Sequence, residues 1–195
     1  MGNDLKIILA SKSPRRREIL KNAGIDFEVF VPDEEEKDII GLKYTDEVVK
    51  KQALEKAKIA VRHFIKSSLD EIEKIIIVTC DTVVVNDDII IGKPKSREDA
   101  FNILKSLSDK EHIVSSAICI YSSGDYKVGN EETKVTFRNL SDEDIINYID
   151  RCKPFDKAGA YGIQDENFDF VEKVSGDIDN VIGFPLKLFY KLYNI

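Results

Sequence analysis

The apolar run IIIVTCDTVVV, residues 75–85, constrains the fold of this 195-residue chain more than any other segment. Every residue in it except Cys80 and Asp81 is β-branched, and β-branched side chains favour the extended backbone of a strand. The turn residues 86–88 follow this run, and a short apolar run at 89–91 comes after them. The sequence therefore predicts a strand at 75–85 and a hairpin that returns the chain beside it.

Asp81 is the anomalous residue of this strand. A carboxylate in apolar surroundings is costly unless it is paired, hydrogen-bonded or bound to a metal. At a strand end facing a cleft, Asp81 could ligate a divalent ion or take a proton from water. The structural alternative is an aspartate that caps a loop or pairs with a buried lysine. We favour the functional interpretation, because perturbed carboxylates cluster at functional sites.

Helical and strand-like patterns alternate along the rest of the chain. Residues 46–66 form the longest helical pattern, with apolar side chains at spacings of three and four. Further strands are expected at residues 5–10, 27–31, 112–121 and 126–137, and further helices begin at Ser13, Ser96, Ser141 and Pro185. This interleaving predicts an α/β fold with a mixed sheet. No repeat or linker is visible, so we expect one domain, residues 1–195, with a cleft that could divide it into two lobes.

Composition narrows the possible partners and location. Hydrophobic residues make up 43% and charged residues 33%, as in a soluble globular protein, and the net charge of -7 disfavours a nucleic-acid or membrane binder. No apolar run approaches the roughly 20 residues of a membrane span, and the basic residues follow the first apolar stretch, unlike a secretory signal. Cys80, Cys119 and Cys152 form no CxxC pair. Free thiols, buried at Cys80 and Cys119, and a cytoplasmic location are expected.

The segment ASKSPRRREIL, residues 10–20, predicts an anion-binding turn. A strand there leads through a polar turn to a helix that begins at Ser13 and Pro14, and helix N-termini attract anions. Arg15 and Arg16 lie in the first turn, where the helix dipole disfavours cations. A bound triphosphate would offset that repulsion. A solvated basic face is the equally weighted alternative.

Two lysines are further candidates for phosphate contacts. Lys56 lies on the flank of the apolar stripe of the 46–66 helix, where a lysine commonly extends into solvent. Its ammonium could instead reach a phosphate in the cleft. Lys93 follows the Asp81 strand by one hairpin, which returns it toward Asp81.

An acidic run at residues 33–36 could complete a metal site with Asp81. Such runs are usually solvated loops, but hard divalent cations need more than one oxygen ligand. Spacing does not decide which carboxylate would serve. The chain has no Walker A loop, GxGxxG, HExxH or GxSxG motif, and only two histidines.

In order along the chain, these blocks resemble the Maf family of nucleotide pyrophosphatases. The resemblance covers nearly the whole sequence: ASKSPRRREIL, EKA around Lys56, CDTVV, GKP at Lys93, VTFRNLSDEDI, PFDKAGAYGIQ and GFPL. It implies an elongated mixed sheet flanked by helices with a deep cleft, similar to the inosine-triphosphate pyrophosphatases. It also implies a nucleoside-triphosphate substrate, a divalent cation (Mg²⁺ or Mn²⁺) and a homodimer.

The resemblance also implies roles for individual residues. Asp81 would be the general base and a metal ligand, and Glu36 aligns best as the second ligand, with Glu35 adjacent. The phosphate contacts would be Ser11, Arg15, Arg16, Lys56 and Lys93.

Three positions indicate the branch of the family. Arg15, Thr82 and Gln164 match the branch that prefers dTTP and UTP, whereas the branch acting on methylated GTP carries Trp, Gln and Glu there. The segment 165–170 departs from the glycine-rich family pattern, which leaves the local loop shape open.

The expected reaction is attack of water on the α-phosphorus, releasing pyrophosphate and a nucleoside monophosphate. The rival hypothesis is a non-catalytic nucleotide-binding regulator of cell division. The full set of polar residues expected for catalysis speaks against it. A plain phosphatase is the enzymatic runner-up.

Overall fold

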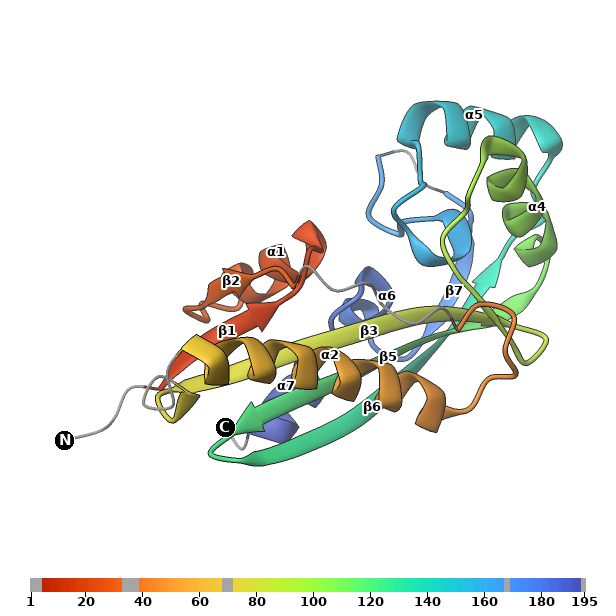
Figure 1. The fold of residues 1–195 in the computed structure, drawn as a ribbon. Coiled ribbons are helices and arrows are strands. Elements are labelled where there is room, and N and C mark those ends of the chain that lie inside the picture. Colours follow the sequence, from red (N-terminus) through yellow and green to blue (C-terminus); the bar gives the residue numbers. More distant parts are fainter. Residues whose placement is uncertain (1–4, 33–38, 68–71, 167–168, 194–195) are drawn as a thin grey trace.

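The computed structural model describes residues 5–32, 39–67, 72–166 and 169–193 (Figure 1). Its strands form one seven-stranded sheet in the order β2-β1-β3-β5-β6-β7, with β4 paired to β3. The strands are β1 (Lys6–Ala10), β2 (Glu28–Phe30), β3 (Ile75–Asn86), β4 (Ile89–Ile91), β5 (Glu111–Ser122), β6 (Asp125–Phe137) and β7 (Val171–Ser175). The helices are α1 (Pro14–Asn22), α2 (Asp46–Ser67), α4 (Arg97–Leu107), α5 (Asp142–Cys152), the 3₁₀ turn η1 (Ala158–Ala160), α6 (Ile178–Ile182) and α7 (Leu186–Tyr193).

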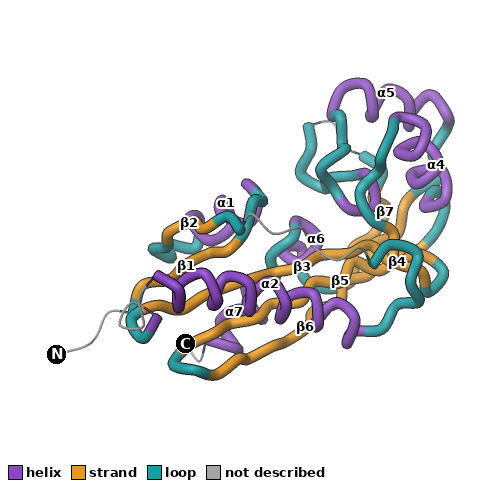
Figure 2. The backbone as a smooth tube through the Cα atoms, in the orientation of Figure 1, coloured by secondary structure: helices purple, strands orange, loops and turns teal. Residues whose placement is uncertain are grey.

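The sheet is mixed, as the alternating sequence pattern predicts. β1 runs parallel to β2 and to β3, whereas β3, β5, β6 and β7 are successively antiparallel. β3, β5 and β6, which have 12, 12 and 13 residues, carry the sheet along the length of the molecule (Figures 1 and 2). The prediction of an α/β fold with an elongated mixed sheet is confirmed.

Helices cover both faces of the long strands (Figure 2). Successive side chains of a strand point to opposite faces, and β3 follows this rule. Val78 and Cys80 pack in a cluster with α1 and α7, whereas Val83 and Val85 pack against Val49 and other apolar residues of α2. The apolar stripe predicted for residues 46–66 therefore faces the sheet.

A further apolar cluster lies at the other end of the sheet, where α4 and α5 stand together (Figure 1). It contains Leu104 of α4, Ile145 of α5, Phe137 of β6 and Tyr161 after η1, all buried. Helices thus gather around both ends of one continuous sheet. The assignment of residues 1–195 to a single domain remains a prediction.

The serines that begin α4 and α5 cap these helices through their side chains, whereas Ser13 at the start of α1 makes no side-chain cap hydrogen bond. The Ser141 hydroxyl accepts from the Asp144 N–H, and the Asp144 carboxylate accepts from the Ser141 N–H, which completes a capping box. Ser96 caps α4 by accepting from the Asp99 N–H, but the Asp99 carboxylate accepts from the N–H of Lys95. The reciprocal bond of a capping box is therefore absent at α4.

The thiols of Cys80 and Cys119 are buried in the core, as predicted, and Cys152 is partly exposed. Burial raises the pKa of the Cys119 thiol to about 12 and also raises that of Cys80. Both thiols are therefore protonated at neutral pH. None of the helices in the described part of the chain is long and apolar enough to cross a membrane.

Candidate active site

The site lies where one edge of β3 is left open. β1 accompanies β3 only as far as the pair Leu9–Val78, and β4 pairs with the same edge from Val84 onward. Between these two points, no strand in the described residues pairs with that edge, whereas β5 pairs with the other edge throughout. Asp81 and Thr82 lie in this gap. They point to opposite faces of the sheet, yet both can reach a pocket at its open edge.

A pocket of about 630 Å³ occupies this position, a size typical of small-molecule sites. Its walls come from the β1–α1 turn, β3, α2, the segment that follows α5, and the turn after α6. Its charged lining residues are Lys12, Arg15, Arg16, Lys56, Lys93, Lys157, Asp81 and Asp156. Basic groups therefore outnumber the two carboxylates, which favours an anionic ligand despite the net charge of -7.

The described residues that the sequence singled out converge on this pocket. Its lining includes Ser11, Arg15, Arg16, Lys56, Asp81, Thr82, Lys93 and Gln164. Their roles in binding and catalysis remain predictions. Glu36 and its alternatives Glu34 and Glu35 lie outside the described residues.

Asp81 pairs with Lys56 across the pocket wall. The Lys56 Nζ lies 2.5 Å from Asp81 Oδ1, and each side chain is only 14% exposed. Lys56 therefore does not extend into bulk solvent along the flank of α2, and that interpretation was wrong. The structural alternative for Asp81, pairing with a lysine, is thus present, and this pair lies in the wall of the same pocket.

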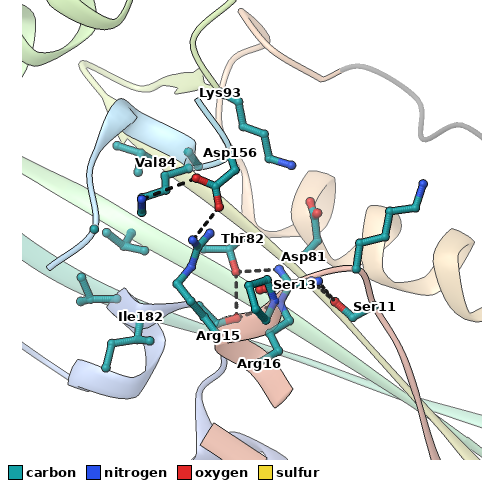
Figure 3. Close-up of a pocket in the computed structure, with 18 of the residues that line it drawn as sticks. Ser11, Ser13, Arg15, Arg16, Asp81, Thr82, Val84, Lys93, Asp156 and Ile182 are labelled. Carbon is teal, nitrogen blue, oxygen red and sulfur yellow. Dashed lines mark hydrogen bonds and ion pairs between the residues drawn. The ribbon is translucent and has the colours of Figure 1, made fainter. Parts of the chain in front are cut away.

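Arg16 is tied to the protein through every nitrogen of its guanidinium group. Its Nε donates to the Gly183 carbonyl at 3.0 Å, and Nη1 donates to the Cys80 carbonyl at 2.6 Å and to Ser11 Oγ at 3.2 Å. Its Nη2 donates to Thr82 Oγ1 at 3.2 Å (Figure 3). Arg16 thus satisfies a carbonyl on the open edge of β3 and joins α1 to the turn after α6.

The hydroxyls of Ser11 and Thr82 belong to the same network. Ser11 is buried, and its Oγ also accepts from the Ser13 N–H at 3.2 Å. Thr82 Oγ1 lies 2.9 Å from Ser116 Oγ and 3.3 Å from the Gly183 carbonyl. The network fixes the shape of the pocket floor, so these side chains are held in place by the protein itself.

Arg15 has a carboxylate partner on the opposite wall. Its Nη1 donates to Asp156 Oδ2 at 2.9 Å, and Lys157 Nζ lies 3.5 Å from Asp156 Oδ1 (Figure 3). Burial raises the pKa of Asp156, but the Arg15 hydrogen bond and the charges of Lys157 and Arg15 outweigh it and hold the pKa below its usual value. An internal anion therefore offsets part of the positive charge at the start of α1.

Lys93 and Gln164 complete the pocket from two other directions. Lys93 follows β4, and its side chain extends into the pocket on the Asp81 side (Figure 3). Gln164 is exposed and lies on the segment after η1. The hairpin therefore returns Lys93 toward Asp81, as its sequence position predicted.

Sequence reasoning missed Asp156 and Lys157. Both lie in the PFDKAGAYGIQ block, from which only Gln164 was singled out. Lys157 is only 12% exposed and contacts both Asp156 and Asp165. An adjacent pair of opposite charges resembles an ordinary solvated surface pair, so the sequence carried no separate signal for them.

The described residues offer few metal ligands. No group of three or more His, Cys, Asp or Glu side chains that could hold a metal occurs among them. The pocket does present the Asp81 and Asp156 carboxylates, which are hard oxygen donors suited to Mg²⁺ or Mn²⁺. Further carboxylates would have to come from elsewhere in the chain.

Comparison with known proteins places the chain in a family. Residues 6–194 match the family model described as "Maf-like protein". The chain is 44% identical over 188 residues to a dTTP/UTP pyrophosphatase of Thermoanaerobacter sp. (strain X514), which covers 95% of this chain and 94% of the relative. Two further relatives are also named dTTP/UTP pyrophosphatase. That of Thermotoga maritima is 43% identical over 187 residues, which cover 96% of this chain and 87% of the relative. That of Clostridium beijerinckii is 43% identical over 194 residues, which cover 98% of this chain and 100% of the relative. The family match spans nearly every described element, and the chain belongs to the Maf-like protein family.

Proposed function

We propose that this protein is a nucleoside-triphosphate pyrophosphatase that converts dTTP and UTP to the nucleoside monophosphate and pyrophosphate. The observation that carries this proposal is the position of Asp81, a carboxylate in the wall of a pocket lined by six lysine and arginine side chains. Such a pocket can hold a polyanion and place a base beside it. Relatives over 40% identical carry the name dTTP/UTP pyrophosphatase, which supports the same assignment.

Six of the pocket residues are given roles in the proposed reaction. Lys93, Arg15 and Lys56 would contact the phosphates, while Arg16 and Ser11 hold the turn that receives them. Asp81 would accept a proton from the water that attacks the α-phosphorus. Because Asp81 is paired with Lys56, we propose that Lys56 exchanges this carboxylate for a phosphate oxygen when the nucleotide binds.

A divalent cation fits the donor chemistry of this pocket. Asp81 would be one ligand and Glu36 a second, and the ion, Mg²⁺ or Mn²⁺, would neutralise charge on the phosphate oxygens and orient the water. Asp81 lines the pocket beside basic groups that can take the remaining phosphate charge. A homodimer and a cytoplasmic location remain predictions from the sequence and the family resemblance.

Gln164 is proposed to select the base. A uracil or thymine ring offers two carbonyl acceptors beside one N3–H donor, and an amide can supply both a donor and an acceptor. Gln164 is exposed and is one of the residues that line the pocket. Thr82 would act through the network that fixes the pocket floor, since its hydroxyl is engaged by Arg16, Ser116 and Gly183.

The decisive experiment incubates the purified protein with dTTP, UTP, CTP, GTP and methylated GTP in the presence of Mg²⁺ or Mn²⁺, and separates the products. Pyrophosphate and dTMP or UMP are expected, with dTTP and UTP turned over fastest and turnover abolished by a chelator. Orthophosphate with nucleoside diphosphate would identify a plain phosphatase. Nucleotide binding without turnover would instead favour the rival, a non-catalytic regulator.

A further inference from the structure

Gln164 is carried by a tight turn. The N–H of Asp165 donates to the Gly162 carbonyl at 2.9 Å, which closes a four-residue turn around Ile163 and Gln164. Gly162, Ile163 and Gln164 all line the pocket. The orientation of the Gln164 amide therefore depends on how this turn is held.

A single hydroxyl holds both ends of the turn. The Gly162 N–H donates to the Tyr148 hydroxyl at 3.0 Å, and that hydroxyl donates to Asp165 Oδ2 at 2.5 Å. Tyr148 comes from α5, is 6% exposed, and its ring lies 5.1 Å from that of Phe170. The phenol thus connects the buried face of α5 to the first and last residues of the turn.

The surroundings leave the turn little freedom. Lys157 Nζ lies 3.3 Å from Asp165 Oδ2, and the two side chains are 12% and 16% exposed. A Cβ atom at Gly162 would lie only 2.8 Å from Asp165 Oδ1 and from Lys157 Cε. Burial, followed by the Asp165 hydrogen bond, raises the pKa of Tyr148, so its hydroxyl remains a proton donor at any physiological pH.

We propose that Tyr148 is a positioning residue for base selection: its hydroxyl, bridging Gly162 and Asp165, orients the turn that presents Gln164 to the pyrimidine. This inference rests on the proposed function and adds to its specificity a residue that is outside the pocket lining but hydrogen-bonded to Gly162 of that lining. A misplacement of about 1 Å in a positioning group can cost a large factor in rate, and unmatched hydrogen bonds are what discriminate between bases.

The test is Tyr148→Phe, which removes the hydroxyl and keeps the ring in the core. The ratio of kcat/KM for dTTP to that for GTP is expected to fall by roughly tenfold, mainly through a higher KM for dTTP. The melting temperature and circular dichroism are measured on the same sample. Tyr44→Phe is the matched control, because the Tyr44 hydroxyl also bonds a carboxylate, that of Glu132, but lies outside the pocket lining. It should leave the ratio unchanged.

Two variants at Asp165 make the test independent of how Tyr148→Phe folds. Asp165→Ala removes the acceptor and should lower the dTTP/GTP ratio as Tyr148→Phe does, with no further loss in the double variant. Asp165→Asn keeps an acceptor oxygen for Tyr148 and should restore most of the ratio. If Asp165→Asn matched Asp165→Ala, the Lys157 ion pair rather than the Tyr148 bond would hold the turn, and the inference would be wrong.

The wild-type measurement distinguishes failure of the proposed function from failure of this inference. A wild-type protein that releases no pyrophosphate from any triphosphate overturns the proposed function together with this inference. A wild-type protein that prefers dTTP, with a folded Tyr148→Phe variant of the same preference, overturns the inference alone.

Discussion

Lys56 Nζ lies 2.5 Å from Asp81 Oδ1, and this ion pair joins α2 to the open edge of β3 inside the pocket. The two side chains come from residues 25 positions apart in the chain and are equally shielded, each 14% exposed. The pair gives the Asp81 carboxylate an oppositely charged partner inside an otherwise apolar strand, where an unpaired carboxylate would be costly. It also places the proposed base and a proposed phosphate ligand in direct contact.

Asp81→Asn should lower turnover of dTTP by at least ~10²-fold, because the amide cannot accept the proton from water. The fold should survive, since an amide of the same shape replaces the carboxylate, as circular dichroism would verify. Asp87→Asn is the matched control: Asp87 is 76% exposed in its side chain and lies in the β3–β4 turn. Full turnover by a folded Asp81→Asn protein would place the base elsewhere.

Lys56→Met should reduce activity strongly by removing both a phosphate contact and the partner of Asp81. We expect KM to rise and kcat to fall together, and the melting temperature to fall as well, because the change leaves the shielded Asp81 carboxylate without its partner. Lys58→Met tests the specificity of the effect, since Lys58 pairs with Glu55 on the exposed side of the same helix. Unchanged KM and kcat in a folded Lys56→Met protein would remove Lys56 from the phosphate contacts.

Asp156→Asn should strengthen inhibition by pyrophosphate. The Asp156 carboxylate neutralises Arg15 and Lys157 at the pocket, so its removal leaves more uncompensated positive charge for an anion. The inhibition constant for pyrophosphate is expected to fall several-fold, and added salt should reduce this difference from the wild type. Asp150→Asn, which breaks the exposed pair with Arg97, should not change it. Weaker inhibition in Asp156→Asn would mean that Asp156 orients Arg15 for binding instead.

Gln164→Glu should weaken the preference for dTTP and UTP over purine triphosphates. An ionised carboxylate can only accept hydrogen bonds, so it no longer matches the acceptors of the pyrimidine edge, whereas it suits the donors of guanine. Competition assays with mixed nucleotides report this ratio directly. Asn139→Asp makes the same chemical change at an exposed residue outside the pocket lining. An unchanged ratio in Gln164→Glu would remove Gln164 from base selection.

Stability should fall between pH 6.5 and about pH 4 because of His112. This imidazole is 2% exposed and lies 2.8 Å from the Tyr161 hydroxyl, and burial lowers its pKa from 6.5 to about 4 against the opposing charge of Glu111. Above pH 6.5 the folded and unfolded states are both neutral at this group. Below it, the unfolded state binds a proton that the folded state refuses, so stability is lost as the pH falls.

Urea unfolding checks this prediction. Between pH 7.5 and pH 5, His112 should lower the free energy of unfolding by on the order of 2 kcal/mol, because each pKa unit corresponds to about 1.4 kcal/mol. His112→Gln should show a correspondingly smaller loss over the same range, each protein being referred to its own value at pH 7.5. His63→Gln is the control, since His63 is exposed on α2. Equal pH dependence in all three proteins would contradict the assignment to His112.

Elements with local signals could be predicted from the sequence. The β-branched run became β3, the apolar stripe of residues 46–66 became the face of α2 against the sheet, and Ser141 with Asp144 formed its capping box. These features depend on side-chain shape, periodicity and neighbouring backbone groups, all of which are read within one segment. β7 and α6 were not predicted, because each has only five residues and β7 is largely exposed.

Which charged side chains meet could not be predicted from the sequence, because it depends on the tertiary fold. The sequence indicated Arg15 and Arg16 equally, yet Arg15 pairs with Asp156, 141 positions away, while Arg16 is bound to Cys80 and Gly183. An arginine that will bind a ligand has the same local pattern as one that will bind the protein. The difference arises only when the order of the strands leaves one edge of β3 open and brings distant segments around it, because the energy of a charge depends on what lies beside it in space.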